Sequence, residues 1–186
     1  MSRLKLLDYD EMTPEQQKLH DEILSGPRSR IGGPMNGWFR SPELGSLIQK
    51  FGAYCRYHTT LEPKLSELAI LVVAKNWRQP VEWAAHKPIA LDQGLDPAIP
   101  DAILAGERPK FSSKEEEAVY DVADEVLTTK KLSEATYKRA LDIFGENTLF
   151  ELTAIISYYL CIALQMNCFA VSVAEGVENA FPDDEG

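Results

Sequence analysis

Two residues, Glu82 and His86, have the types and the spacing that acid/base chemistry requires. They lie four positions apart in a segment whose pattern predicts a helix, so their side chains share one face and lie one turn apart. A carboxyl group and an imidazole in that arrangement can exchange a proton with a shared ligand. Ordinary exposed helix pairs have the same spacing, so spacing alone does not separate the two interpretations.

A second carboxylate, Glu67, interrupts the apolar run 65–74. A buried unpaired charge would be costly there, or the pKa of the carboxyl group would rise. We therefore expect Glu67 to be paired, protonated or directed into a cavity. A structural salt bridge to Lys64 or Arg78 is one alternative, and an interaction with His86 is the other.

The short turn 78–80 decides whether these residues meet. If it folds two helices back antiparallel, Glu67 lies beside His86, and Glu82 joins them in one pocket. A histidine near two carboxylates supplies a general base and a general acid near neutral pH. Enolisation, decarboxylation with reprotonation and isomerisation are feasible there. The H-x-x-x-H and E-x-x-H arrangements of helical metal sites are absent, so we predict neither a metal nor a cofactor.

Capping residues, prolines and glycines predict that helices carry these side chains. No segment shows the alternating pattern of a strand, and the predicted fold class is all-α. The segment 26–40 is rich in glycine and proline and predicts a long loop that contains Trp38 and Arg40. Helices are expected at about 14–25, from Ser41-Pro42 to residue 54 or 55, at 63–77, 81–93, within 96–106, from Ser113 to about 127, from Ser133 to about 144, and at 147–167.

Composition restricts the function classes. The chain has 186 residues, 45% hydrophobic and 26% charged, as is usual for one globular domain. Its 19 basic and 29 acidic residues give a formal charge of -10, which disfavours nucleic acid and anionic membrane surfaces as partners. The apolar stretch 152–163 is shorter than the roughly 20 residues a bilayer requires and predicts a buried core helix. The acidic tail 182–186 is expected to be loose.

The cysteines favour a reducing compartment. Cys55, Cys161 and Cys168 form no C-x-x-C motif, and residues seven apart on a helix are too far apart for a disulfide. The segment 1–10 lacks the apolar core and cleavage site of a signal peptide. We therefore expect a cytoplasmic location. His20 and His58 are expected at the surface with no role.

The stretch from Glu67 through His86 to Gly94 resembles the core motif of the carboxymuconolactone decarboxylase and AhpD-like superfamily. Its matching positions include Asn76, near the turn, and Glu82. The resemblance implies a single helical domain over residues 1–186, built around a central antiparallel helix pair, with the core motif at about 41–106.

The two branches of that superfamily imply different chemistries. The peroxidase branch has two cysteines three positions apart, which are replaced here by Gln79 and Glu82. The run Val-Glu-Trp-Ala-Ala-His, residues 81–86, is more similar to the decarboxylase branch, whose reaction is the cofactor-free loss of carbon dioxide from a lactone acid. The chain resembles most closely the longer members, whose substrate is undefined.

The resemblance and the residues together predict a lyase or isomerase that acts on a small carboxylated or lactone compound. His86 would move the proton, Glu67 would orient the His86 imidazole, and Glu82 would be the second acid/base group. Arg40 or Arg30, with Trp38, could hold a substrate carboxylate, and Asn76 is a further predicted substrate contact.

Two alternatives remain open. The first is an AhpD-like peroxidase that uses a single thiol such as Cys55 or Cys161, and the second is a non-catalytic oligomer that binds a hydrophobic ligand. The resemblance also implies a homo-oligomer, either a trimer or a hexamer, as the working form.

Overall fold

The structure, a computed structural model, describes residues 2–182, and every regular element in that range is a helix. The all-α prediction is therefore confirmed. The tail 183–186 lies outside the described residues. After a 3-10 turn at Tyr9–Glu11, the helices are α1 (Pro14–Ser25), α2 (Met35–Trp38), α3 (Pro42–Tyr57), α4 (Pro63–Asn76), α5 (Pro80–Asp92), α6 (Ala98–Ala105), α7 (Lys114–Thr129) and α8 (Glu134–Cys168).

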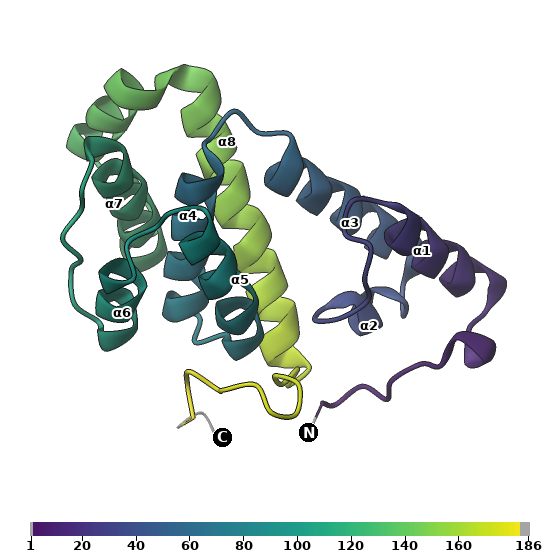
Figure 1. Ribbon diagram of the computed structural model, residues 1–186. Helices are drawn as coiled ribbons and strands as arrows, with labels where there is room; N and C mark the ends of the chain where they lie inside the picture. The colour runs from purple at the N-terminus through teal and green to yellow at the C-terminus, as the bar shows by residue number, and fades with distance from the viewer. Residues whose placement is uncertain (1, 183–186) are drawn as a thin grey trace.

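The helices form two groups (Figure 1). Helices α4 to α8 make a bundle in which α4 is central and contacts α5, α6, α7 and α8. Helices α1 to α3 lie to one side of this bundle, and α3 packs against α8. Residues 65–74 of α4 are all buried, as expected for a helix that is contacted from several sides.

The turn between α4 and α5 produces the predicted antiparallel pair. Arg78 adopts the left-handed conformation at φ 48, and Gln79 caps α5 by accepting a hydrogen bond from the backbone N–H of Val81 at 2.7 Å. The Gln79 amide also donates to Asn167 at 2.8 Å, and Asn167 donates to the carbonyl oxygen of Trp77 at 2.8 Å. These bonds tie the turn to the end of α8 and fix how the two helices meet.

Helix α8 combines two predicted helices. Gly145 interrupts it with φ 73 and ψ 171, a conformation that glycine adopts without steric cost, so the predicted break near this residue is present as a kink. By length and composition α8 could also cross a membrane, but 56% of its most apolar window is buried within the protein. That burial agrees with the interpretation of 152–163 as a core helix.

The segment 26–40 differs from the predicted loop, because residues 35–38 form the short helix α2. Trp38 and Phe39 are buried, and burial requires their backbone groups to be hydrogen-bonded. The helical turn meets this need, since the N–H of Trp38 donates to the carbonyl oxygen of Pro34 and that of Phe39 to the carbonyl oxygen of Met35.

Candidate active site

Glu67 of α4 and His86 of α5 meet in the core of the antiparallel pair. The distance between Nδ1 of His86 and Oε2 of Glu67 is 2.6 Å, and both residues are 6% exposed. Of the alternatives open from the sequence, the structure pairs Glu67 with His86, whereas Lys64 pairs with Glu116 at 3.0 Å. The short turn between the helices makes this contact possible.

The Glu67 contact determines what the imidazole of His86 can do. When the Glu67 carboxyl group accepts this hydrogen bond, it holds the imidazole proton on Nδ1 and leaves the lone pair on Nε2. The ring of Tyr159 packs edge-on against the imidazole, with the ring centroids 5.0 Å apart. His86 is therefore held in one orientation, with a basic nitrogen available for a ligand.

Glu82 lies one turn before His86 on α5 and is 3% exposed. Neither of its carboxyl oxygens has a hydrogen-bond partner among residues 2–182. Burial raises the pKa of Glu82 well above its ordinary value of 4.5, because the charged form loses its hydration. Burial therefore favours the protonated form of Glu82, a carboxylic acid with a proton to donate.

A cavity of about 360 Å³ opens beside Glu82 and His86. Its other walls come from α8, which supplies Tyr158 and Tyr159, from the segment before α2, and from Arg56 of α3. Burial raises the pKa of Tyr158 to about 12 and raises that of Tyr159 as well, so both phenols keep their protons at neutral pH. The two tyrosines, Glu82 and His86 are among the polar groups that a small ligand would meet.

Arg28, which the sequence analysis did not select, also lines this cavity. One guanidinium N–H of Arg28 donates to the hydroxyl oxygen of Tyr158 at 3.0 Å, and the guanidinium lies 5.9 Å from the ring centroid of Trp38. Its Nε is buried and has no hydrogen-bond partner in the described part of the chain. Together with Arg30 and Arg56 it gives the cavity a cationic side, which suits a carboxylate ligand.

The predicted substrate contacts do not all gather at this cavity. Trp38 lines it, but Arg40 lines a neighbouring cavity, where its guanidinium donates to the carbonyl oxygen of Lys5. Asn76 lines a third hollow, between α4, α6 and α7. The structure therefore unites Glu67, Glu82, His86 and Trp38, and it places Arg40 and Asn76 elsewhere.

The cysteines are not part of the site. Within the described chain, no cysteine lines the cavity beside His86. Cys55 is buried, and desolvation raises its pKa to about 11; burial also raises the pKa of Cys161. Among residues 2–182, no group of three or more His, Cys, Asp or Glu side chains is arranged to hold a metal ion.

No protein-family model matches the sequence, and no curated protein matches it. A solved structure does. It is described as an alkylhydroperoxidase AhpD core, an uncharacterized peroxidase-related protein from Ralstonia eutropha JMP134. The two structures align with a TM-score of 0.76 over 94% of this chain and 93% of the other, at 12% sequence identity. The chain therefore has the AhpD-like fold that the sequence resemblance predicted.

Proposed function

We propose that this AhpD-like helical protein is a cofactor-independent acid/base enzyme, a lyase or isomerase of the carboxymuconolactone decarboxylase type. Its substrate would be a small carboxylated or lactone compound. The observation that carries the proposal is that two groups line one cavity: Glu82, whose buried carboxyl oxygens have no hydrogen-bond partner among residues 2–182, and His86, whose imidazole is held by Glu67.

The proposed chemistry uses both groups. In an isomerisation, Nε2 of His86 removes a proton from the carbon next to a carbonyl group, and the electron pair moves to the carbonyl oxygen as Glu82 protonates it. His86 then returns its proton to a different carbon of the enol as Glu82 takes back the hydroxyl proton, which re-forms the carbonyl group. In a decarboxylation, the electrons of the broken C–C bond form the same enol as carbon dioxide leaves, and a proton is then returned to carbon. Glu67 holds the imidazole and stabilises the imidazolium that forms.

The test uses a panel of β-keto acids and unsaturated lactone acids in deuterated water. Proton NMR follows deuterium incorporation, and a coupled assay follows the release of carbon dioxide. We expect His86→Asn and Glu82→Gln each to lower the rate about 10²- to 10⁴-fold, the usual contribution of a positioned acid or base. His58→Asn, at an exposed histidine on the end of α3, is the matched control and should retain full activity.

The proposal is wrong if the wild-type protein and His86→Asn give equal rates across the panel while both are folded by circular dichroism. A ligand that binds tightly and is never converted would favour the non-catalytic alternative.

The similar structure is described as peroxidase-related, so a peroxidase is the second candidate. Thiol-based peroxide reduction requires a thiolate, and the raised pKa values of Cys55 and Cys161 oppose its formation. A variant in which all three cysteines are replaced by alanine decides between the two candidates. It should keep its acid/base activity, whereas loss of a peroxide-consuming activity would favour the peroxidase.

The proposal extends to assembly and location. Its partner is a small molecule, and its working form is a homo-oligomer, a trimer or hexamer. Four large apolar or aromatic side chains of α3 support assembly because they are exposed; they are Leu44, Leu47, Phe51 and Tyr54. Three unpaired cysteines support a reducing, cytoplasmic environment.

A further inference from the structure

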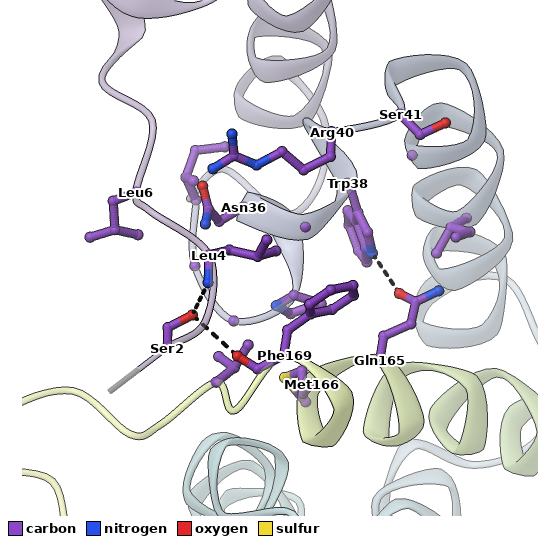
Figure 2. A pocket seen from close by; sticks show the side chains of 18 of the residues that line it. Ser2, Leu4, Leu6, Asn36, Trp38, Arg40, Ser41, Gln165, Met166 and Phe169 are labelled. Atoms are coloured by element: carbon purple, nitrogen blue, oxygen red, sulfur yellow. Dashed lines mark hydrogen bonds between the residues drawn. The ribbon is translucent and has the colours of Figure 1, made fainter.

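A second cavity, of about 580 Å³, lies next to the candidate active site. Figure 2 shows it between the N-terminal segment, α2, α3 and the end of α8. Its lining is mainly apolar and includes Leu4, Leu44, Ile48, Phe169 and Val171. Both cavities fall within the size range of small-molecule sites, but the second holds none of the acid/base groups.

The N-terminal segment lines one side of this cavity. The backbone N–H of Arg3 donates a hydrogen bond to the carbonyl oxygen of Phe169 at 2.9 Å. The Arg3 guanidinium donates another to the carbonyl oxygen of Cys168, also at 2.9 Å. These are carbonyl groups at the end of α8, which lack partners within the helix. Because the segment is fixed there, Leu4 covers the cavity from the side shown in Figure 2.

The two cavities share one wall. Residues 31–34, Trp38 and Met166 line both of them, so the wall is a single layer of residues. Trp38 is fixed, because its indole N–H donates to Gln165 at 3.2 Å, a bond drawn in Figure 2. Met166 is unbranched and adapts its shape readily, and Gly32 and Gly33 add no side chain to the wall. Passage is therefore easiest beside Met166.

The chemistry of the two cavities is complementary. The first offers Arg28, Glu82 and His86, whereas the second is mainly apolar, and the Arg40 in its lining is hydrogen-bonded to the carbonyl oxygen of Lys5. Arg28 lies at the boundary, with its guanidinium near the Trp38 ring and its buried Nε without a partner among the described residues. A ligand that filled both cavities would need an anionic head to bind Arg28 and a hydrocarbon tail to bury beyond Met166.

We propose that the substrate is a carboxylic acid with a hydrocarbon tail, whose head lies among Arg28, Glu82 and His86 and whose tail passes Met166 into the second cavity. This inference rests on the proposed function, because it takes the first cavity as the reacting site. It makes the second cavity the part of the protein that selects substrates by chain length.

The test measures binding without turnover, so it does not depend on any reaction. Saturated linear carboxylates from butanoate to decanoate are titrated into the full-length protein by isothermal titration calorimetry. Each added CH₂ that enters the second cavity should tighten binding about fourfold. Octan-1-ol should bind at least tenfold more weakly than octanoate, because it has no carboxylate for Arg28.

Two variants block the second cavity from different elements. Leu44→Trp fills it from α3 and Val171→Trp fills it from the segment after α8, and each should bring the affinity of octanoate to within about twofold of that of butanoate. Leu24→Trp is the matched control. Leu24 is 41% exposed and Leu44 is 52% exposed, but Leu24 lines neither cavity. Binding to the Leu24→Trp variant should therefore depend on ligand chain length as it does in the wild type.

Three results would overturn the inference. They are an affinity that does not change with chain length, equal binding of octanoate and octan-1-ol, and an unchanged chain-length dependence in both blocking variants. If the affinity does not change with ligand chain length and light scattering shows that the protein is dimeric, the second cavity would instead be part of the contact between two copies of the chain. Chain-length-dependent binding in a protein that fails the acid/base assay would refute the proposed function and leave the amphipathic binding site standing.

Discussion

Glu82 illustrates how a single residue acquires chemistry from its surroundings. A glutamate on an exposed helix face is ionised at neutral pH. Here α5 and α8 bury it, neither of its oxygens has a partner within residues 2–182, and its pKa is raised. Catalytic carboxylic acids are produced in this way, by loss of hydration and without a special ligand.

The raised pKa of Glu82 predicts a specific pH dependence of stability. Above pH 4.5 the unfolded chain releases the Glu82 proton and the folded chain retains it, so the folded state binds more protons. The free energy of unfolding then falls as pH rises, by up to about 1.4 kcal/mol per pH unit from this group. Below pH 4.5 both states are protonated and the penalty is absent.

Glu82→Gln removes this titration. Chemical denaturation at a series of pH values should show that the variant gains stability relative to the wild type as pH rises above 4.5 and that the gain disappears near pH 4. Glu43→Gln, at an exposed position of α3, is the control and should follow the wild-type profile. A constant difference between Glu82→Gln and the wild type at every pH would show that the folded-state pKa of Glu82 is not raised.

At the scale of elements, the contact between α3 and α8 positions the cationic side of the site. Gly52 of α3 lies directly against the Tyr158 ring and the Arg28 guanidinium, and a methyl group there would overlap both. The absence of a side chain at Gly52 therefore allows Tyr158 to reach Arg28. The ring of Phe51 also packs edge-on against Tyr158, at a centroid distance of 5.4 Å.

We predict that Gly52→Ala destabilises the protein by about 1–3 kcal/mol, the usual cost of overpacking, although alanine favours a helix by about 1 kcal/mol. The variant should also weaken carboxylate binding, because Arg28 must move. Urea denaturation and octanoate titration measure the two effects. In a Tyr158→Ala background, most of the stability loss should vanish; an equal loss in both backgrounds would place the strain elsewhere.

At the scale of the whole molecule, α3 carries exposed apolar side chains. Leu47 is 62% exposed, and Phe51 is 44% exposed although one edge of its ring contacts Tyr158. Spacings of three and four residues place these side chains in one stripe. An exposed apolar stripe of this kind is typical of a surface that associates with another chain.

If α3 forms the oligomer interface, Leu47→Glu combined with Phe51→Glu should convert a trimer or hexamer into smaller species, because each glutamate would bring a charge into the contact. Light scattering coupled to size-exclusion chromatography gives the mass. Leu24→Glu, on the exposed side of α1, should leave the mass unchanged. A wild-type protein that is monomeric at every concentration tested would contradict the prediction.

The sequence by itself determined the long helices, though not α2, and the candidate acid/base residues of this protein, because both depend on local pattern. The Thr13 cap, the prolines that begin α3, α4 and α5, and the break at Gly145 act within a few residues. Spacing placed Glu82 and His86 on one face, and the short turn limited α4 and α5 to an antiparallel arrangement in which Glu67 reaches His86.

The tertiary structure decided what surrounds those residues. Arg28 and Tyr158 are 130 positions apart, and no local pattern distinguishes Arg28 from Arg30 or Arg40 in the same segment. Arg28 and Arg30 line the cavity and Arg40 does not, and the position of Arg28 depends on how α3 packs on α8 and on the space at Gly52. The raised pKa of Glu82 and the wall shared by the two cavities depend on the same packing, because desolvation and enclosure are properties of assembled helices.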